Sequence, residues 1–272
     1  MSEHPTTADR IRPWAVLIAL PVTLAMAALG AGLLGGTAIQ DSSSGALSAD
    51  ATPLAPGSGA FRIWSVIYLG LAVYAVWQVL PRNRADERQR ATGWLAVASL
   101  VLNALWITVA QLGLLWLTVV VMLLLLAVLC LIFDRLVRAR AGSWLEAIVV
   151  DGTFGLYLGW VSVATVANIA AWLADLGVRP AAYEVPAIVV LVVAALVAVA
   201  IALRGGGRVA PAAAMIWGIG WIGTARWLGE PRSEAIAIAA WILCVVILLV
   251  TIAIRQRSVE PRPARPGVPL GR

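Results

Sequence analysis

Apolar and polar positions alternate along this chain in long blocks. Eight predominantly apolar segments are separated by short polar ones, at residues 14–39, 61–80, 92–111, 113–133, 151–174, 185–203, 209–228 and 235–254. About 20 apolar residues are needed for a helix to cross ~30 Å of hydrocarbon. The pattern therefore predicts an all-α, polytopic transmembrane helix bundle with about eight spans. Only Gln111-Leu112-Gly113 separates the third span from the fourth, which predicts an antiparallel helical hairpin.

Composition agrees with a membrane location. The chain is 61% hydrophobic and 12% charged, whereas soluble domains carry about 25% charged residues. All 20 basic residues are arginine, and the predicted spans place sixteen of them on one side. The other side has four, namely Arg62, Arg179, Arg226 and Arg232. Because positive residues concentrate in cytoplasmic loops, both termini are predicted to be cytoplasmic. The same explanation makes a nucleic-acid partner unnecessary despite the high pI.

Two features bear on function without a specific motif. The stretch from Gln40 to Ala60 is rich in Ser, Gly, Ala and Pro, and it is the longest loop between predicted spans. Such a loop is either a lid over a site or a slack linker.

Cys130 and Cys244 each stand alone in an apolar span, and the single histidine, His4, precedes the first span. We therefore expect no metal site and no required cofactor.

The fifth span has polar and aromatic residues where a lipid-facing helix would be aliphatic. It reads LYLGWVSVATVAN from Leu156 to Asn168. Polar groups at membrane depth must face protein or ligand, since lipid offers them no hydrogen bonds. Trp160, Ala164 and Asn168 are spaced by four and share one helix face. This face is a predicted binding wall.

Three segments in order resemble the TspO/MBR family, the tryptophan-rich sensory or translocator proteins. The second span reads FRIWSVIYLGLAVYAVW, the third contains LNALW, and the fifth contains the stretch above. Leu156 replaces the family's proline in the fifth-span motif, and Arg62-Ile63 replace its Gly-Pro. The resemblance covers residues 14–176. The positions that match the family's ligand-binding motifs are Trp64, Tyr68, Asn103, Trp106, Tyr157, Trp160, Ala164 and Asn168.

The resemblance implies a five-helix core (14–176). The predicted spans and the composition add an N-terminal cytoplasmic tail (1–13), three additional helices (177–254) that depart from the family, and a disordered basic, Pro-rich tail (255–272). The resemblance also implies a bacterial plasma (inner) membrane protein that binds a porphyrin or another tetrapyrrole as a sensor or regulator. Two alternatives remain open: a small transporter of an apolar compound, and photo-oxidative porphyrin degradation with Trp64 and Trp160 as electron donors. Oligomer formation is also open, because the additional helices could replace a dimer contact.

Several single residues allow both a structural and a functional interpretation. Trp64 and Trp106 could form an aromatic belt at the lipid headgroups or a wall for a planar ligand. Asn103 and Asn168 could either join helices by hydrogen bonds or contact a ligand. The helix-joining role is favoured for Asn103, and the ligand contact for Asn168.

Four further expectations concern packing and the interfaces. Ser143 and Glu146 are predicted to form a capping box. Asp151 is expected to pair with Arg135 or Arg138. Arg226 is expected to anchor the seventh span at the interface. Trp217 and Trp221 are expected to pack between helices.

Overall fold

The computed structural model describes residues 6–35 and 37–259, and every regular element within them is helical. Eight of these helices are long: α1 (Thr7–Gly30), α2 (Ile63–Val79), α4 (Glu87–Gln111), α5 (Leu115–Arg138), α7 (Thr153–Asp175), α8 (Glu184–Gly205), α9 (Val209–Leu228) and α10 (Glu234–Val259). The short elements are η1 (Ser43–Gly45), η2 (Ser58–Arg62), α3 (Pro81–Arg84), α6 (Trp144–Glu146) and the π-helix η3 (Ala147–Gly152). The predicted all-α bundle is confirmed.

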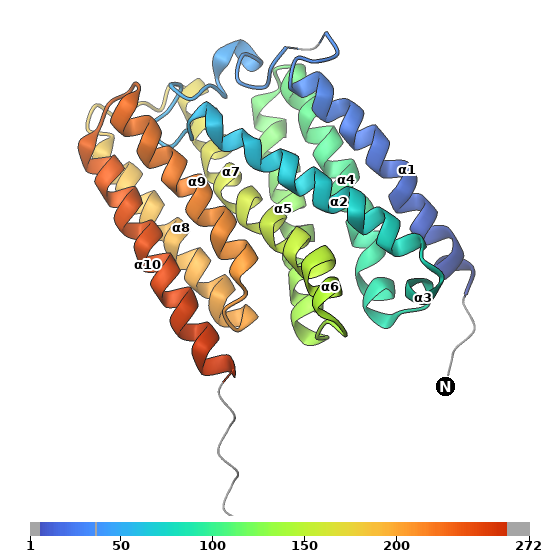
Figure 1. The fold of residues 1–272 in the computed structure, drawn as a ribbon. Helices are drawn as coiled ribbons and strands as arrows, with labels where there is room; N and C mark the ends of the chain where they lie inside the picture. The colour runs from blue at the N-terminus through green and yellow to red at the C-terminus, as the bar shows by residue number, and fades with distance from the viewer. Residues whose placement is uncertain (1–5, 36, 260–272) are drawn as a thin grey trace, which may run out of the picture.

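The long helices run in alternating directions and pack side by side (Figure 1). One end of the bundle contains the start of α1 and the end of α10, and we call it the terminal end. The opposite end contains residues 31–35 and 37–62, and we call it the loop end. Helices α1, α2 and α4 lie on one side and α8, α9 and α10 on the other, with α5 and α7 between them (Figure 1).

Helix α9 joins the two sides of the bundle. It packs against α7 on one side and against α10 and α8 on the other. Among the described residues, seven helical segments are long and apolar enough to cross a membrane, and α9 is not one of these seven. Its three glycines, three tryptophans and Arg226 lower its hydropathy. A helix covered by neighbouring helices can carry such residues because they face protein rather than lipid.

The first and last helices differ from their predicted bounds. Helix α1 begins at Thr7 rather than residue 14, because Thr6 and Asp9 form a complete capping box. It ends at Gly30 rather than residue 39, and Gly32 and Gly35 follow with φ of +76° and +80°, which favour glycine. Residues 7–13 are thus helix, not tail. Helix α10 continues to residue 259, so residues 255–259 are helix rather than tail. The rest of the predicted tail, 260–272, lies outside the described residues.

Two turn predictions can be compared with the structure directly. The tight turn between α4 and α5 is confirmed, with Gly113 at φ +72°. The capping box at Ser143 is half right. The Ser143 hydroxyl accepts a hydrogen bond from the Glu146 amide, but the Glu146 carboxylate accepts from the amide of Gly142 instead. Helix therefore continues from Trp144 to Asp175 and includes the predicted fifth span, 151–174.

The contact between α7 and α9 depends on a missing side chain. A Cβ at Gly159 would lie 2.2 Å from the carbonyl oxygen of Pro211 on α9, too close for any real contact. At Gly220, on the same α9, the nearest atom would be the Cys244 sulfur at 3.8 Å, which is an ordinary contact. Small residues let helix backbones approach in this way in membranes.

We predict that Gly159→Ala lowers the free energy of unfolding by ~1–3 kcal/mol, the usual cost of overpacking. The matched variant Gly220→Ala should be neutral or stabilising, because alanine is the better helix former. Thermal unfolding of both purified proteins in detergent measures the difference. Equal melting temperatures would show that the α7–α9 approach is not constrained by Gly159.

Candidate functional site

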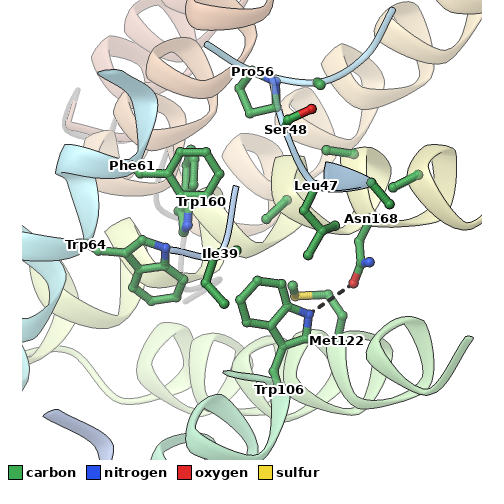
Figure 2. A pocket seen from close by; sticks show the side chains of 15 residues that line it. Ile39, Leu47, Ser48, Pro56, Phe61, Trp64, Trp106, Met122, Trp160 and Asn168 are labelled. Carbon is green, nitrogen blue, oxygen red and sulfur yellow. Dashed lines mark hydrogen bonds between the residues drawn. The ribbon is translucent and has the colours of Figure 1, made fainter. Parts of the chain in front are cut away.

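A small chamber lies at the loop end, between α2, α4, α5 and α7 (Figure 2). Residues of the 37–62 segment form its roof. Its volume is about 50 Å³. The lining is almost entirely apolar and aromatic: Ile39, Ala46, Leu47, Ser48, Ala55, Pro56, Phe61, Trp64, Trp106, Met122, Trp160, Ala164, Ala167, Asn168 and Ala171.

A larger side groove adjoins the chamber between α1, α2 and α4. Its volume is about 490 Å³, which is within the ~300–1,000 Å³ of small-molecule pockets. Its rim includes Leu33, which is 78% exposed. Four side chains line both cavities and form the partition between them: Ile39, Phe61, Trp64 and Trp106. Chamber and groove therefore adjoin each other and share one partition.

Aromatic rings from α2 and α7 form a continuous wall beside the chamber. Trp64 stacks on Tyr68 with ring centroids 5.2 Å apart, and it meets Trp160 edge-to-face at 6.2 Å. Phe61 also meets Trp160 edge-to-face, at 5.8 Å. The motif spacing explains this arrangement, since residues three and four apart on one helix share a face. The wall offers both flat faces and ring edges to a planar ligand.

Trp106 approaches the chamber from α4, opposite this wall. Its indole nitrogen donates a hydrogen bond to Asn168 Oδ1 at 3.1 Å (Figure 2). Asn168 Nδ2 donates in turn to the Thr118 hydroxyl at 2.9 Å. Trp106 is only 8% exposed, so the belt interpretation is wrong for this residue. Asn168 joins α7 to α4 and α5, and its side chain already has a donor and an acceptor as partners.

Asn103 has the structural role favoured by its sequence context. Its Oδ1 accepts a hydrogen bond from the Tyr68 hydroxyl at 3.0 Å, which joins α4 to α2. Both side chains line the side groove. The pair therefore contributes the main polar patch to an otherwise apolar groove.

Trp160 differs from the other polar side chains around the chamber. It is 1% exposed, and its indole N–H has no acceptor among the described residues. A buried donor without a partner costs free energy, of the order of 1–3 kcal/mol. Trp160 also lines the chamber, where its nitrogen points toward the space beside Ile39 (Figure 2). The Trp160 N–H is thus a buried donor beside the chamber that has no partner in the described part of the chain.

The structure brings together seven of the eight residues that match the family motifs. Five line the chamber, namely Trp64, Trp106, Trp160, Ala164 and Asn168, and two line only the groove, Tyr68 and Asn103. Tyr157 is the exception, because it lines neither cavity. It is fully buried behind Trp64, at 5.7 Å between ring centroids, and supports the wall from the rear.

The structure favours the lid alternative for the 40–60 loop, although no single loop residue was predicted as part of the site. Leu47, Ser48, Ala55 and Pro56 come from the 40–60 loop, which lies over the chamber and is not a slack linker. Its apolar residues among Ser and Gly were the available signal. Outside the membrane, the Ser48 hydroxyl donates to Asp50 and lowers the pKa of that carboxyl.

Arg226 fastens this roof to α9, and the prediction of an interfacial anchor is wrong. The side chain is fully buried, and its guanidinium donates to the carbonyl oxygens of Thr52 and Ala49. Trp217 and Trp221, from the same helix, contact the loop as well. Trp221 packs against the core as predicted and also against the loop, whereas Trp217 is 39% exposed and contacts the loop through its hydrogen bond to Ala60.

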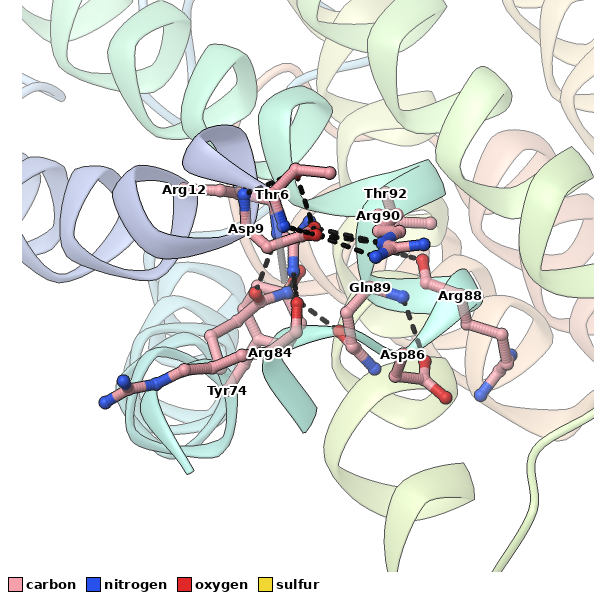
Figure 3. A network of polar contacts seen from close by, with 11 residues as sticks. Thr6, Asp9, Arg12, Tyr74, Arg84, Asp86, Arg88, Gln89, Arg90 and Thr92 are labelled. Carbon is pink, nitrogen blue, oxygen red and sulfur yellow. Dashed lines mark hydrogen bonds and ion pairs between the residues drawn. The ribbon is translucent and has the colours of Figure 1, made fainter. Parts of the chain in front are cut away.

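At the terminal end, polar side chains close the bundle under α1, α2 and α4 (Figure 3). Asp9 pairs with Arg12 at 3.0 Å and with Arg90 at 2.8 Å. Gln78 accepts from Arg12 and donates to the Gln89 side chain at 2.8 Å. These groups are buried or half-buried, and each ionic group has an oppositely charged partner within the protein, as burial requires.

A second cluster joins the two sides of the bundle at the same end. Arg88 pairs with Glu146 and, at 2.9 Å, with Asp151. Asp151 also pairs with Arg208 at the start of α9. The expected pairing of Asp151 with Arg135 or Arg138 is wrong, because the π-helix η3 turns its carboxylate toward Arg88.

Comparison with known proteins supports one family. A family model described as TSPO-like protein matches residues 13–253. The match includes the predicted core and also α8, α9 and α10. No curated protein and no solved structure matches the chain.

We predict that Asn168→Leu destabilises the bundle by ~1–3 kcal/mol, because the Trp106 indole and the Thr118 hydroxyl lose their partner. In a Trp106→Phe background the same change should cost less, since one of those partners is already absent. A double-mutant cycle on thermal unfolding measures this coupling. Additive effects of the two substitutions would contradict an energetic link between these residues.

Proposed function

Because the chain belongs to the TSPO-like protein family, we propose that it is a membrane sensor or regulator that binds a planar hydrophobic ligand of the porphyrin or tetrapyrrole class. The ligand occupies the side groove and reaches the chamber. The unpaired Trp160 N–H beside an aromatic-lined cavity is the observation that supports this proposal most directly.

The chemistry of the cavity suits such a ligand. Trp64 and Trp106 line both chamber and groove and offer flat aromatic surface. The Trp160 N–H is a donor for an acceptor at the ligand's edge, such as a carboxylate or carbonyl oxygen. Apolar lining with a few well-placed polar groups is typical of small-molecule sites.

The volumes favour the groove for the ring system. The chamber, at about 50 Å³, holds only a few atoms, whereas the groove, at about 490 Å³, is of ligand size. Ile39 lies between Trp64 and Trp106 in the partition (Figure 2). Rotation of its side chain joins the two cavities, so that the ligand's edge can reach Trp160.

The proposed orientation follows from charge. Loops at the terminal end contain Arg82, Arg84, Arg138 and Arg140, whereas the loop end has few arginines. The positive-inside rule then places the terminal end in the cytoplasm of a bacterial plasma membrane. In this orientation the side groove opens near the outer leaflet, where an apolar ligand partitions from the bilayer.

We predict that Trp160→Phe weakens protoporphyrin IX binding about tenfold, the loss expected for one hydrogen bond of ~1.4 kcal/mol. The substitution keeps an aromatic ring and breaks no hydrogen bond of the free protein. Loss of a hydrogen-bond partner therefore should not lower the melting temperature of the variant. Quenching of tryptophan fluorescence on titration with protoporphyrin IX measures the affinity.

Trp116→Phe is the matched control, because Trp116 is 55% exposed on α5 and lines neither cavity. It removes one fluorophore and should leave the affinity unchanged. Unsaturable quenching in the parent protein, or equal affinities for all three proteins, would overturn the proposed ligand site.

A further inference from the structure

The roof of the chamber is attached to α9, a helix that does not line the chamber itself. Arg226 supplies the central contact. Its Nη2 donates to the Ala49 carbonyl oxygen at 2.6 Å and its Nη1 to that of Thr52 at 3.1 Å. Its side chain forms no ion pair with any carboxylate of the described residues. Its hydrogen-bond partners are therefore two carbonyl oxygens of the loop, while Asp50 and Glu230 attract the guanidinium from beyond ion-pair distance.

Two tryptophans of α9 hold the other end of the same loop segment. The Trp217 indole donates to the Ala60 carbonyl oxygen at 2.8 Å, and the Gly57 amide donates to the Trp221 carbonyl oxygen at 3.2 Å. A Cβ at Gly59 would lie 2.2 Å from the Trp221 ring, so the loop backbone lies directly on the indole. The segment 49–60 is thus fastened at both ends.

The residues between these contacts form part of the roof. Ala55 and Pro56 line the chamber and are buried, and Leu47 and Ser48 immediately precede the segment. If the Arg226 hydrogen bonds break, this stretch loses its support near Ala49 and Thr52. The chamber then opens to the aqueous side at the loop end.

We propose that Arg226 is a positioning residue that latches the roof over the chamber and sets the rate at which ligand enters and leaves. The identity of the ligand rests on the proposed function. The contact between Arg226 and the loop is present without any ligand. Hydrogen bonds from a charged donor are roughly twice as strong as neutral ones, which favours the closed roof. Lifting the loop exposes the guanidinium to water, and this hydration offsets part of the loss. The roof can therefore open without unfolding α9.

Cysteine accessibility tests the latch without any ligand. In a Cys130→Ser, Cys244→Ser background, Ala55→Cys places one thiol beneath the roof. A water-soluble, membrane-impermeant maleimide should react slowly with it, and the rate should rise at least tenfold after Arg226→Gln. Arg226→Lys, which keeps the charge but offers a single donor atom, should give an intermediate rate.

Arg232→Gln is the matched control, since Arg232 lies at the same end and is exposed, with 62% of its side chain accessible. It should leave the labelling rate unchanged. Trp217→Phe removes the hydrogen bond to the Ala60 carbonyl oxygen without leaving a charge unpaired. This variant should also accelerate labelling. It therefore tests the latch even if Arg226→Gln fails to fold. If the Arg226 variants fold and are labelled at the parent rate, the latch is overturned. If the Arg226 variants do not fold, labelling of Trp217→Phe at the parent rate overturns it. Acceleration in Arg232→Gln equal to that in the Arg226 variants would also overturn it.

Ligand kinetics separate this proposal from the proposed function. Protoporphyrin IX, pre-bound and then diluted, should dissociate at least tenfold faster from Arg226→Gln than from the parent. Faster labelling without protoporphyrin binding to the parent would support the latch and refute the ligand assignment. Saturable binding to the parent with unchanged labelling and dissociation rates would refute the latch alone.

Discussion

Polar groups inside this bundle must find their partners within the protein, and this constraint determines how the helices are arranged. Lipid neither accepts hydrogen bonds nor drives helices together by the hydrophobic effect. Asn168 therefore bonds to α4 and α5, and Asp151 joins η3 to α4 and to Arg208 at the start of α9. Close backbone approach at Gly159 adds packing between α7 and α9. Each of these contacts fixes one helix relative to another, and together they hold the aromatic wall in place.

The number of helices and the convergence of Trp64, Trp106 and Trp160 were predictable from the sequence. Apolar length gives seven of the eight long helices, and the block pattern also marks α9, whose hydropathy is lower. The resemblance to the TspO/MBR family implied which helix faces meet. The partners of Arg226 were not predictable in this way. They are backbone carbonyl groups about 175 positions away in the chain, and any residue type can supply a carbonyl. Its position near a helix end, beside Glu230, suggested the surface instead.

The count of arginines on each side of the membrane did not reveal that some of them form ion pairs inside the protein. Sixteen of them were predicted on one side of the membrane, and this asymmetry was interpreted as a signal of orientation. The structure shows that Arg12, Arg88 and Arg208 are also buried or half-buried ion-pair partners. An arginine at the end of a span can thus both contribute to the membrane orientation and form a buried ion pair. The spacing of apolar residues in the sequence cannot distinguish these two roles. The shift of α1 toward the N-terminus has the same origin, since Asp9 both caps the helix and pairs with Arg90.

The contact between Gly59 and Trp221 has an evolutionary consequence. Because the loop backbone rests on the indole with no space for a Cβ, neither position can change freely while the other stays the same. A larger residue in the loop requires a smaller one on α9, and a smaller one on α9 leaves a gap beneath the loop. Among homologues that preserve this roof, substitutions at the two positions should therefore occur as correlated pairs. The first half of the gene would then not diverge independently of the last third.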